Sequence, residues 1–137
     1  MGRQEEIIKE RLRKLQAMRA EGINPYPQVF EVKDYSKDLH NKHKSLKNGA
    51  KSKKKAVIAG RLMSIRDFGK IAFGVIQDRK GTIQIALQSG ETPEKVHNLF
   101  KKSVDTGDII GVEGIIWRTE RGELSVLVKN FIILSKS

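Results

Sequence analysis

The sequence predicts a mainly β fold, a small five-stranded barrel that carries one inserted helix and is preceded by an N-terminal α-helix. Residues 56–87 hold three apolar runs separated by polar turns, which are too short for the crossovers that parallel strands need. A helical pattern follows the third run, and two more apolar runs follow that helix. Gly60 stands in the middle of the first run, where a strand that serves two sides of a barrel must bend.

The N-terminal helix is predicted over Glu5–Glu21. Its apolar residues recur at spacings of four, three and three, which places one apolar stripe on a charged rod. The stripe consists of Ile8, Leu12, Leu15 and Met18. Gly22 is placed to end the helix, and the two prolines at positions 25 and 27 then favour extended backbone.

Residues 33–55 are predicted to form a mobile, lysine-rich connector with at most a short helix around Ser36 to Leu46. They contain nine Lys against two Asp, and therefore +7 of the formal net charge of +11. His40 and His43 are three residues apart but have no third ligand nearby. We therefore expect two solvated loop histidines rather than a metal site.

The three strands of residues 56–87 are separated by turns at residues 66–70 and 78–81, which are rich in charged and turn-forming residues. In the third strand Ile83, Ile85 and Leu87 alternate with Thr82, Gln84 and Ala86. This period of two is typical of a strand with one buried and one solvated face. A solvated face that carries an aromatic ring and an amide suits an unpaired nucleic-acid base.

The second half of the barrel begins with a helix, for which Thr92 is the predicted cap and Pro93 the first residue. A fourth strand is predicted over Ile109–Trp117 and a fifth over Glu123–Leu134. Three strands, a helix and two strands follow one another in the OB-fold, a five-stranded Greek-key barrel. We therefore divide the chain into residues 1–55, helix and connector, and residues 56–137, the OB-fold domain.

Composition excludes several classes of function. The chain has no cysteine, which rules out disulfides, thiolate metal sites and cysteine nucleophiles. It shows no membrane-spanning apolar run and no signal peptide, so a soluble cytoplasmic protein without a membrane partner is expected. Phosphate loops, dinucleotide fingerprints and catalytic triads are not found, so the chain is predicted to bind rather than to catalyse.

The positive charge indicates a polyanionic partner, nucleic acid before membrane. The lysine run of the connector ends in Lys53, Lys54 and Lys55. We expect these three residues to contact phosphates and to make binding dependent on salt. The alternative is that the charge serves solubility alone.

Several motifs along the chain occur together in one known family. They are Gly22-Ile23-Asn24-Pro25-Tyr26-Pro27, Ala59-Gly60-Arg61-Leu62-Met63, Gly69-Lys70, Ile83-Gln84, Gly107-Asp108-Ile109 and Gly122-Glu123-Leu124-Ser125. Their order resembles the N-terminal anticodon-binding domain of class II lysyl-tRNA synthetases, and the resemblance covers nearly the whole chain. Jointly the motifs are specific, whereas Ile83-Gln84 alone would be weak.

The resemblance implies recognition of a central anticodon uridine during tRNA aminoacylation, with the anticodon stem-loop of a tRNA as partner. Phe73 resembles the family's stacking aromatic residue and Gln84 the amide that recognises uridine. Arg66 and Glu123 resemble the polar companions of that amide. The four together are persuasive because Arg66 lies in the first turn and Glu123 follows the last, and these two turns flank the nucleic-acid face of an OB-fold.

The resemblance also sets expectations for the rest of such an enzyme. ATP and Mg²⁺ belong to the catalytic domain of the family, and the three class II catalytic motifs do not occur in this sequence. We therefore expect no cofactor in this chain and no aminoacylation by the chain alone. A homodimer is expected through the N-terminal helix or through a catalytic domain.

Simpler interpretations stay open. Phe73 could be a core residue and Gln84 an idle surface amide, while Arg66 and Glu123 could be solvated turn charges. The chain could be a stand-alone OB-fold RNA-binding protein without anticodon preference, or an assembly module that dimerises through residues 5–21. The barrel is shared with aspartyl and asparaginyl relatives, and the segment of residues 23–27 favours the lysyl branch.

Overall fold

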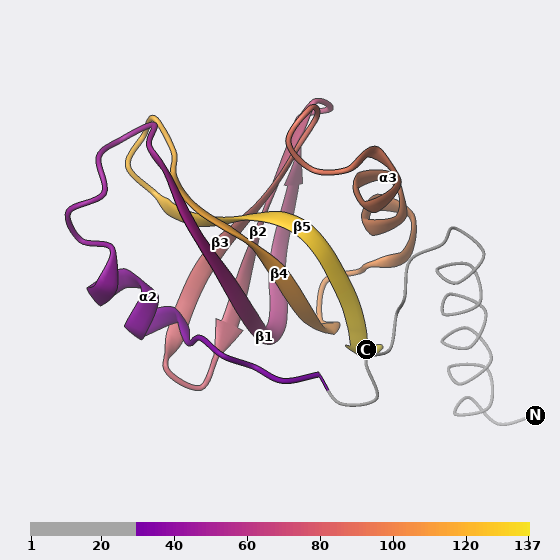
Figure 1. Ribbon diagram of the computed structural model, residues 1–137. Coiled ribbons are helices and arrows are strands. Elements are labelled where there is room, and N and C mark those ends of the chain that lie inside the picture. The colour runs from indigo at the N-terminus through magenta and orange to yellow at the C-terminus, as the bar shows by residue number, and fades with distance from the viewer. Residues whose placement is uncertain (1–29) are drawn as a thin grey trace, which may run out of the picture.

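The structure is a computed structural model that describes residues 30–137 as a closed five-stranded β-barrel with two helices (Figure 1). The elements are α2 (Ser36–Lys42), β1 (Lys51–Asp67), β2 (Ile71–Asp78), β3 (Gly81–Gln88), α3 (Glu94–Ser103), β4 (Ile109–Arg118) and β5 (Leu124–Ser135). The predicted N-terminal helix and its role in dimerisation lie outside the described residues. Within residues 30–137 no helix is long and apolar enough to cross a membrane.

The long strand β1 closes the barrel, because its first half pairs with β4 and its second half with β2. Arg61 has a partner in both neighbours, Gln77 in β2 and Ile109 in β4. The strand order is β1-β2-β3-β5-β4, and only the short β3–β5 pair is parallel. This order confirms the predicted mainly β fold with OB-fold connectivity.

The bend in β1 lies where the sequence predicted it. A Cβ atom on Gly60 would stand 2.3 Å from the carbonyl oxygen of Gln77, so only glycine allows this approach of two backbones. A register shift between Leu62 and Ser64 marks a bulge directly after the bend. Together the glycine and the bulge let one strand serve two neighbours.

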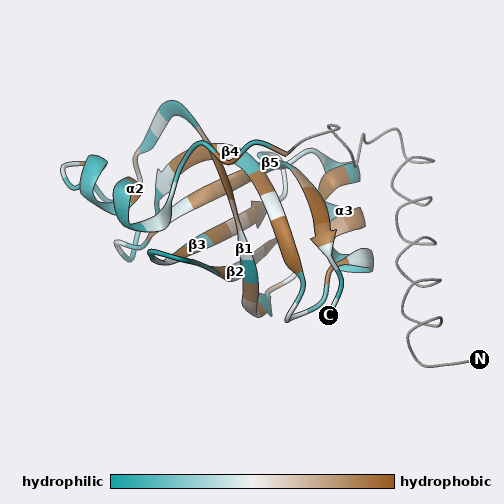
Figure 2. Ribbon diagram, turned by 90° about the horizontal axis from the view of Figure 1, so that it is seen from below, coloured by the Kyte–Doolittle hydropathy of each residue, from teal (hydrophilic) through white to brown (hydrophobic). Residues whose placement is uncertain are grey.

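The barrel interior is filled by the apolar face of every strand. Ile83, Ile85 and Leu87 of β3 are almost completely buried, as their alternation predicted. Figure 2 shows hydrophobic residues along β3, β4 and β5, whereas α2 is largely hydrophilic. Because adjacent residues of a strand point to opposite faces, the same register also decides which residues face outward.

Helix α3 packs Val96, Leu99 and Phe100 into the core, and the ring of Phe100 meets that of Phe131 edge-to-face at 5.1 Å. The predicted cap is wrong in detail. Pro93 holds the N-cap position, and no side chain caps the helix. The hydroxyl of Thr92 instead accepts the backbone N–H of Gln88 at 3.1 Å, because the turn between β3 and α3 offers it that closer donor.

Residues 33–55 are not the mobile connector that the sequence predicted. Helix α2 occupies the start of the expected short helix, and Leu39 reaches the core. The lysine run Lys51–Lys55 is the beginning of β1 and pairs with β4. The prediction failed because a strand is held by backbone hydrogen bonds, so side chains that face solvent can all be lysine.

Helix α2 is fixed to the turn between β2 and β3. Ser36 donates its backbone N–H and its hydroxyl to the carboxylate of Asp78, both at 2.7 Å. Burial would raise the pKa of Asp78, but hydrogen bonds from Ser36, Lys80 and Gly81 outweigh burial and lower this pKa.

The predicted pair of solvated histidines is also wrong. His40 contacts the backbone carbonyl of Thr82 through Nε2 at 3.0 Å. His43 is buried, and its pKa is lowered by that burial and by nearby cations. Among residues 30–137 no cluster of three or more potential metal ligands occurs.

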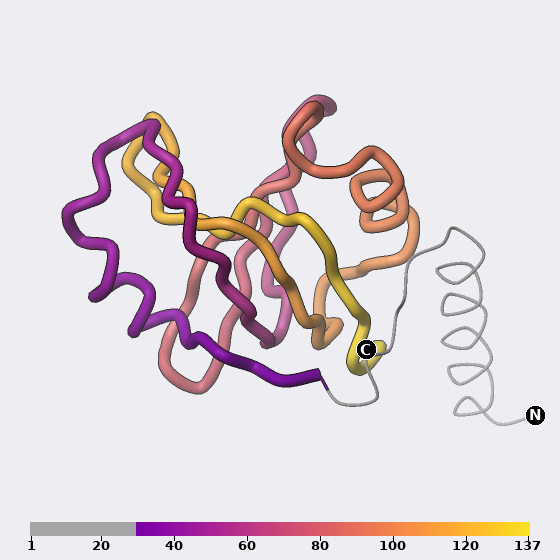
Figure 3. Tube along the Cα trace, viewed as in Figure 1, coloured from indigo at the N-terminus to yellow at the C-terminus, as the bar shows by residue number. Residues whose placement is uncertain are grey.

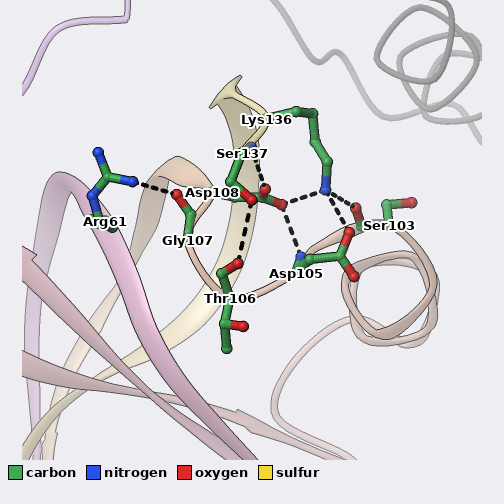
Figure 4. A network of polar contacts seen from close by, with 8 residues as sticks. All are labelled: Arg61, Ser103, Asp105, Thr106, Gly107, Asp108, Lys136 and Ser137. Atoms are coloured by element: carbon green, nitrogen blue, oxygen red, sulfur yellow. Dashed lines mark hydrogen bonds and ion pairs between the residues drawn. The ribbon is translucent and has the colours of Figure 1, made fainter. Parts of the chain in front are cut away.

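A buried ion pair holds the last residues of the chain against the turn between α3 and β4 (Figure 4). The carboxylate of Asp108 is fully buried and accepts the backbone N–H groups of Asp105 and Ser137 at 2.8 and 3.0 Å. The ammonium group of Lys136 contacts the same carboxylate and also donates to the carbonyl of Ser103. These contacts fix the end of β5 beside α3.

We expect Asp108→Asn to lower the free energy of unfolding by about 2–4 kcal/mol, because it removes a buried charge on which three donors converge. The measurement is urea unfolding of the purified chain. The matched control is Glu113→Gln, which removes an exposed carboxylate 3.5 Å from Lys55 and should cost less than about 1 kcal/mol. Equal losses in the two variants would show that the Asp108 network does not stabilise the fold.

Candidate nucleic-acid interface

An open groove of about 720 Å³ lies between the β1–β2 turn (residues 68–70), the outer faces of β2 and β3, and the β4–β5 turn (residues 119–123). Its walls are mixed, with aromatic rings, charges and one amide. The residues that line it are Arg66, Phe68, Phe73, Val75, Gln84, Trp117, Thr119, Glu120, Arg121 and Glu123.

The four residues that the resemblance singled out all line this groove. Strand register explains how: Arg66 at the end of β1 is paired with Phe73 in β2. Gln84 in β3 is paired with Ser125 in β5, two residues after Glu123. Residues from distant parts of the chain are therefore brought together by the closure of the barrel.

Phe73 lies on the outer face of β2 and not in the core. Its neighbours Ala72 and Gly74 are buried toward the barrel interior, whereas Phe73 is half-buried on the other face. The ring of Phe68 stands edge-on to the ring of Phe73, with centroids 6.2 Å apart and planes at 68°. This T-shaped pair is a favoured aromatic geometry, and it orients the Phe73 ring at the groove.

Gln84 is held by a short chain of hydrogen bonds. Its side-chain nitrogen donates to the hydroxyl of Ser125 at 2.8 Å, and that hydroxyl donates to the backbone carbonyl of Glu123 at 3.2 Å. One amide hydrogen is thereby committed. The amide oxygen and the second hydrogen have no other partner within residues 30–137, so the side chain can both accept and donate at the groove.

The charges of the groove are two arginines and two glutamates. Arg66 and Arg121 are exposed and form no ion pair with any residue in the described part of the chain. Glu120 and Glu123 are likewise exposed, on the β4–β5 turn. Donors and acceptors therefore face the same space, which suits a base edge better than it suits an isolated phosphate.

Lys53, Lys54 and Lys55 do not line the groove. They stand in the first part of β1, which pairs with β4, and Lys55 lies 3.5 Å from Glu113. Their predicted contact with phosphates stays a prediction.

Sequence reasoning missed six of the ten residues that line the groove: Phe68, Val75, Trp117, Thr119, Glu120 and Arg121. Phe68 is 64% exposed, and an aromatic residue in a glycine-containing turn was the available signal. Trp117 is the only tryptophan of the chain and the last residue of the predicted fourth strand. It is half-buried and, through the pairs Trp117–Ser125 and Ser125–Gln84, lies in the same cross-strand row as Gln84.

Helix α3 supports the turn that carries Arg66 and Phe68. The ammonium group of Lys101 donates to the carbonyl of Gly69 at 2.9 Å and lies 3.2 Å from the carboxylate of Asp67. The backbone N–H of Gly69 and this ammonium group lower the pKa of Asp67. One cation thus contacts both Gly69 within the turn and Asp67 directly before it.

Comparison with known proteins agrees with the barrel fold. The tRNA anticodon family model, described as an OB-fold nucleic acid binding domain, matches residues 56–134. A lysine–tRNA ligase of Trichormus variabilis is 39% identical over 141 residues, which cover 98% of this chain and 25% of that protein. A lysine–tRNA ligase of Christiangramia forsetii is 40% identical over 100% of this chain and 23% of that protein. A lysine–tRNA ligase of Aeromonas hydrophila is 42% identical over 95% of this chain and 26% of that protein. The chain therefore spans about a quarter of the length of these relatives.

We expect Lys101→Met to loosen the β1–β2 turn without unfolding the barrel, since partly exposed ion pairs contribute at most about 1 kcal/mol. Amide hydrogen exchange should become faster at residues 67–71 and stay unchanged in β4 and β5. The matched control is Lys102→Met, at an exposed position of the same helix with no partner in residues 30–137. Unchanged exchange at the turn in the Lys101 variant would contradict this support.

Proposed function

The chain belongs to the tRNA anticodon family of OB-fold nucleic acid binding domains, and from this membership we propose that it binds the anticodon loop of a tRNA as part of a lysine–tRNA ligase. Within that role it recognises a central anticodon uridine. The observation that carries the proposal is the convergence of Arg66, Phe73, Gln84 and Glu123 on one groove. The relatives described above supply the amino-acid specificity, since all three are lysine–tRNA ligases.

In the proposed complex the central base stacks on Phe73. An aromatic ring offers its face to any base, and one stacked base contributes about 1–3 kcal/mol to binding. Stacking alone does not distinguish bases, because every base has a π-face. Discrimination must therefore come from the polar groups around the ring.

Uridine presents two carbonyl acceptors on either side of one N–H donor. The uncommitted oxygen and N–H of Gln84 match two adjacent groups of that edge. Arg66 can donate to the remaining carbonyl, and the ionised carboxylate of Glu123 can accept an N–H or orient Arg66. The bond from Gln84 to Ser125 fixes the amide before RNA arrives, which lowers the entropic cost of binding.

Cytidine would not satisfy the same groups. It replaces one carbonyl by an amino donor and the N–H by a bare acceptor, so a donor would face Arg66 or an acceptor would face Glu123. A desolvated polar group without a partner costs about 1–3 kcal/mol, and more when one partner is charged. One mismatch therefore corresponds to a loss of at least about tenfold in affinity.

The role of this domain is recognition and not chemistry. Stacking and hydrogen bonds need no cofactor, so we assign ATP and Mg²⁺ to the remainder of such a ligase.

The second candidate function is that of an RNA-binding protein without anticodon preference. It is favoured by one observation, the absence of any acidic residue between Asp38 and Asp67, because a basic stretch binds all RNA through its phosphates.

The decisive experiment compares anticodon stem-loops that differ only at the central base. We expect the wild-type chain to bind central uridine at least about tenfold more tightly than central cytidine. Gln84→Ala should lose most of this preference and keep much of its salt-dependent affinity, since phosphate contacts are independent of base. Binding is measured by fluorescence anisotropy. Equal affinity of the wild type for both stem-loops would reject the anticodon role in favour of the second candidate.

A further inference from the structure

The chain contains one long basic stretch, of which Arg66 lines the groove. Residues 39–66 contain seven Lys and two Arg but no Asp or Glu. The stretch comprises the end of α2, the α2–β1 loop (residues 43–50) and most of β1. The α2–β1 loop of this stretch lies against the β4–β5 turn, which forms one wall of the groove (Figure 3).

Arg118 joins this loop to the turn. Its guanidinium group donates to the carbonyls of His43 at 2.9 Å and Leu46 at 2.6 Å, both in the loop. The same group donates to the carbonyl of Gly122 in the turn at 2.8 Å. This arginine is therefore occupied by protein carbonyls and serves to position the loop rather than to bind a ligand.

Backbone contacts reinforce the connection. The N–H of Gly49 donates to the carbonyl of Arg118 at 2.8 Å, and the N–H of Arg118 donates to the carbonyl of Ala50. Gly49 has a φ of +80°, and a Cβ atom there would lie 2.4 Å from the carboxylate of Glu120. Loop and turn are thus packed so closely that they form one preformed wall.

Ion pairing separates the cations of this region into two groups. Lys51 and Lys55 lie within 4 Å of Glu91 and Glu113. Lys44 and Lys47, in contrast, are exposed on the loop and have no acidic partner within residues 30–137. Two unpaired cations on a fixed loop next to a groove are suited to bind a polyanion, because little order is lost on binding.

We propose that the α2–β1 loop is a second RNA-contacting surface, on which Lys44 and Lys47 bind phosphates of the strand that leaves the groove across the β4–β5 turn. The inference rests on the proposed function in one respect, that RNA bases occupy the groove. The loop contributes position and affinity but no base preference, since its cations meet phosphates and not base edges. Arg121, exposed on the turn between groove and loop, lies on the path of the same strand.

The test is the salt dependence of binding by the full 137-residue chain. The probe is an RNA hairpin with a seven-nucleotide loop and a central uridine, and log K is measured against log salt by anisotropy. Lys44→Gln/Lys47→Gln should flatten the slope by about 1.4, at about 0.7 for each lost single-strand phosphate contact. Its ratio of affinities for central uridine and cytidine should stay that of the wild type.

The matched control is Lys95→Gln/Lys102→Gln, which makes the same charge change at two exposed positions of α3. Figures 1 and 2 place α3 at the opposite side of the barrel from α2. The control should keep the wild-type slope. Equal flattening in both double variants would overturn the proposal, because it would show an effect of net charge alone, and so would an unchanged slope in the loop variant.

The outcomes also separate this inference from the proposed function. A wild type that does not discriminate uridine from cytidine, together with the predicted difference in slope, rejects the anticodon role and supports the loop as an RNA contact. Discrimination without a difference in slope supports the anticodon role and overturns the loop. A changed base preference in the loop variant would show that these lysines contact bases, which also overturns the assignment.

Discussion

The pairing of β1 with two neighbours is the constraint on which the rest of the structure depends. Because β1 hydrogen-bonds to β4 in its first half and to β2 in its second, the sheet closes and leaves no free edge there. Closure requires the bend at Gly60, where no side chain fits. It also brings the β1–β2 turn and the β4–β5 turn to the two sides of one groove. The candidate interface is therefore a consequence of how the barrel closes.

Charge and hydrogen bonding in this chain serve two different purposes. Some cations are used inside the fold: Lys136 meets a buried carboxylate, Lys101 supports the turn beside the groove, and Arg118 joins two loops. Others, such as Lys44 and Lys47, face solvent without a partner among residues 30–137. The first group gives the interface its shape, and the second is available to an anionic ligand. Substituting a cation of the first group should therefore change the shape of the interface, whereas substituting one of the second should change the affinity for an anionic ligand.

The sequence predicted the strands well because their pattern is local. Alternation alone identified Ile83, Ile85 and Leu87 as an inner face, and the order of elements identified the barrel. The lysine-rich start of β1 escaped prediction, since its pairing with β4 is set by distant backbone. The cap at Thr92 failed for a related reason, because a closer backbone donor captured the hydroxyl.

The groove itself could be predicted only in part. Phe73 was ambiguous by pattern, and the resemblance to a family rather than its spacing suggested its role; the register of β2 then placed it outside the core. Phe68 and Trp117 could be assigned to the groove only once β4 and the first turn were assembled beside β3, because position in a turn or at a strand end does not say which strands become neighbours. That these residues contact RNA stays a prediction.

The most direct test of the central claim is nuclear magnetic resonance of the labelled chain bound to an anticodon stem-loop with a central uridine. The account predicts intermolecular nuclear Overhauser effects between the ring protons of Phe73 and the H5 and H6 protons of that uridine. It also predicts that these base protons shift upfield, as expected for a base above an aromatic ring. A saturated complex in which the central uridine contacts α3 or another surface, and not Phe73, would contradict the account.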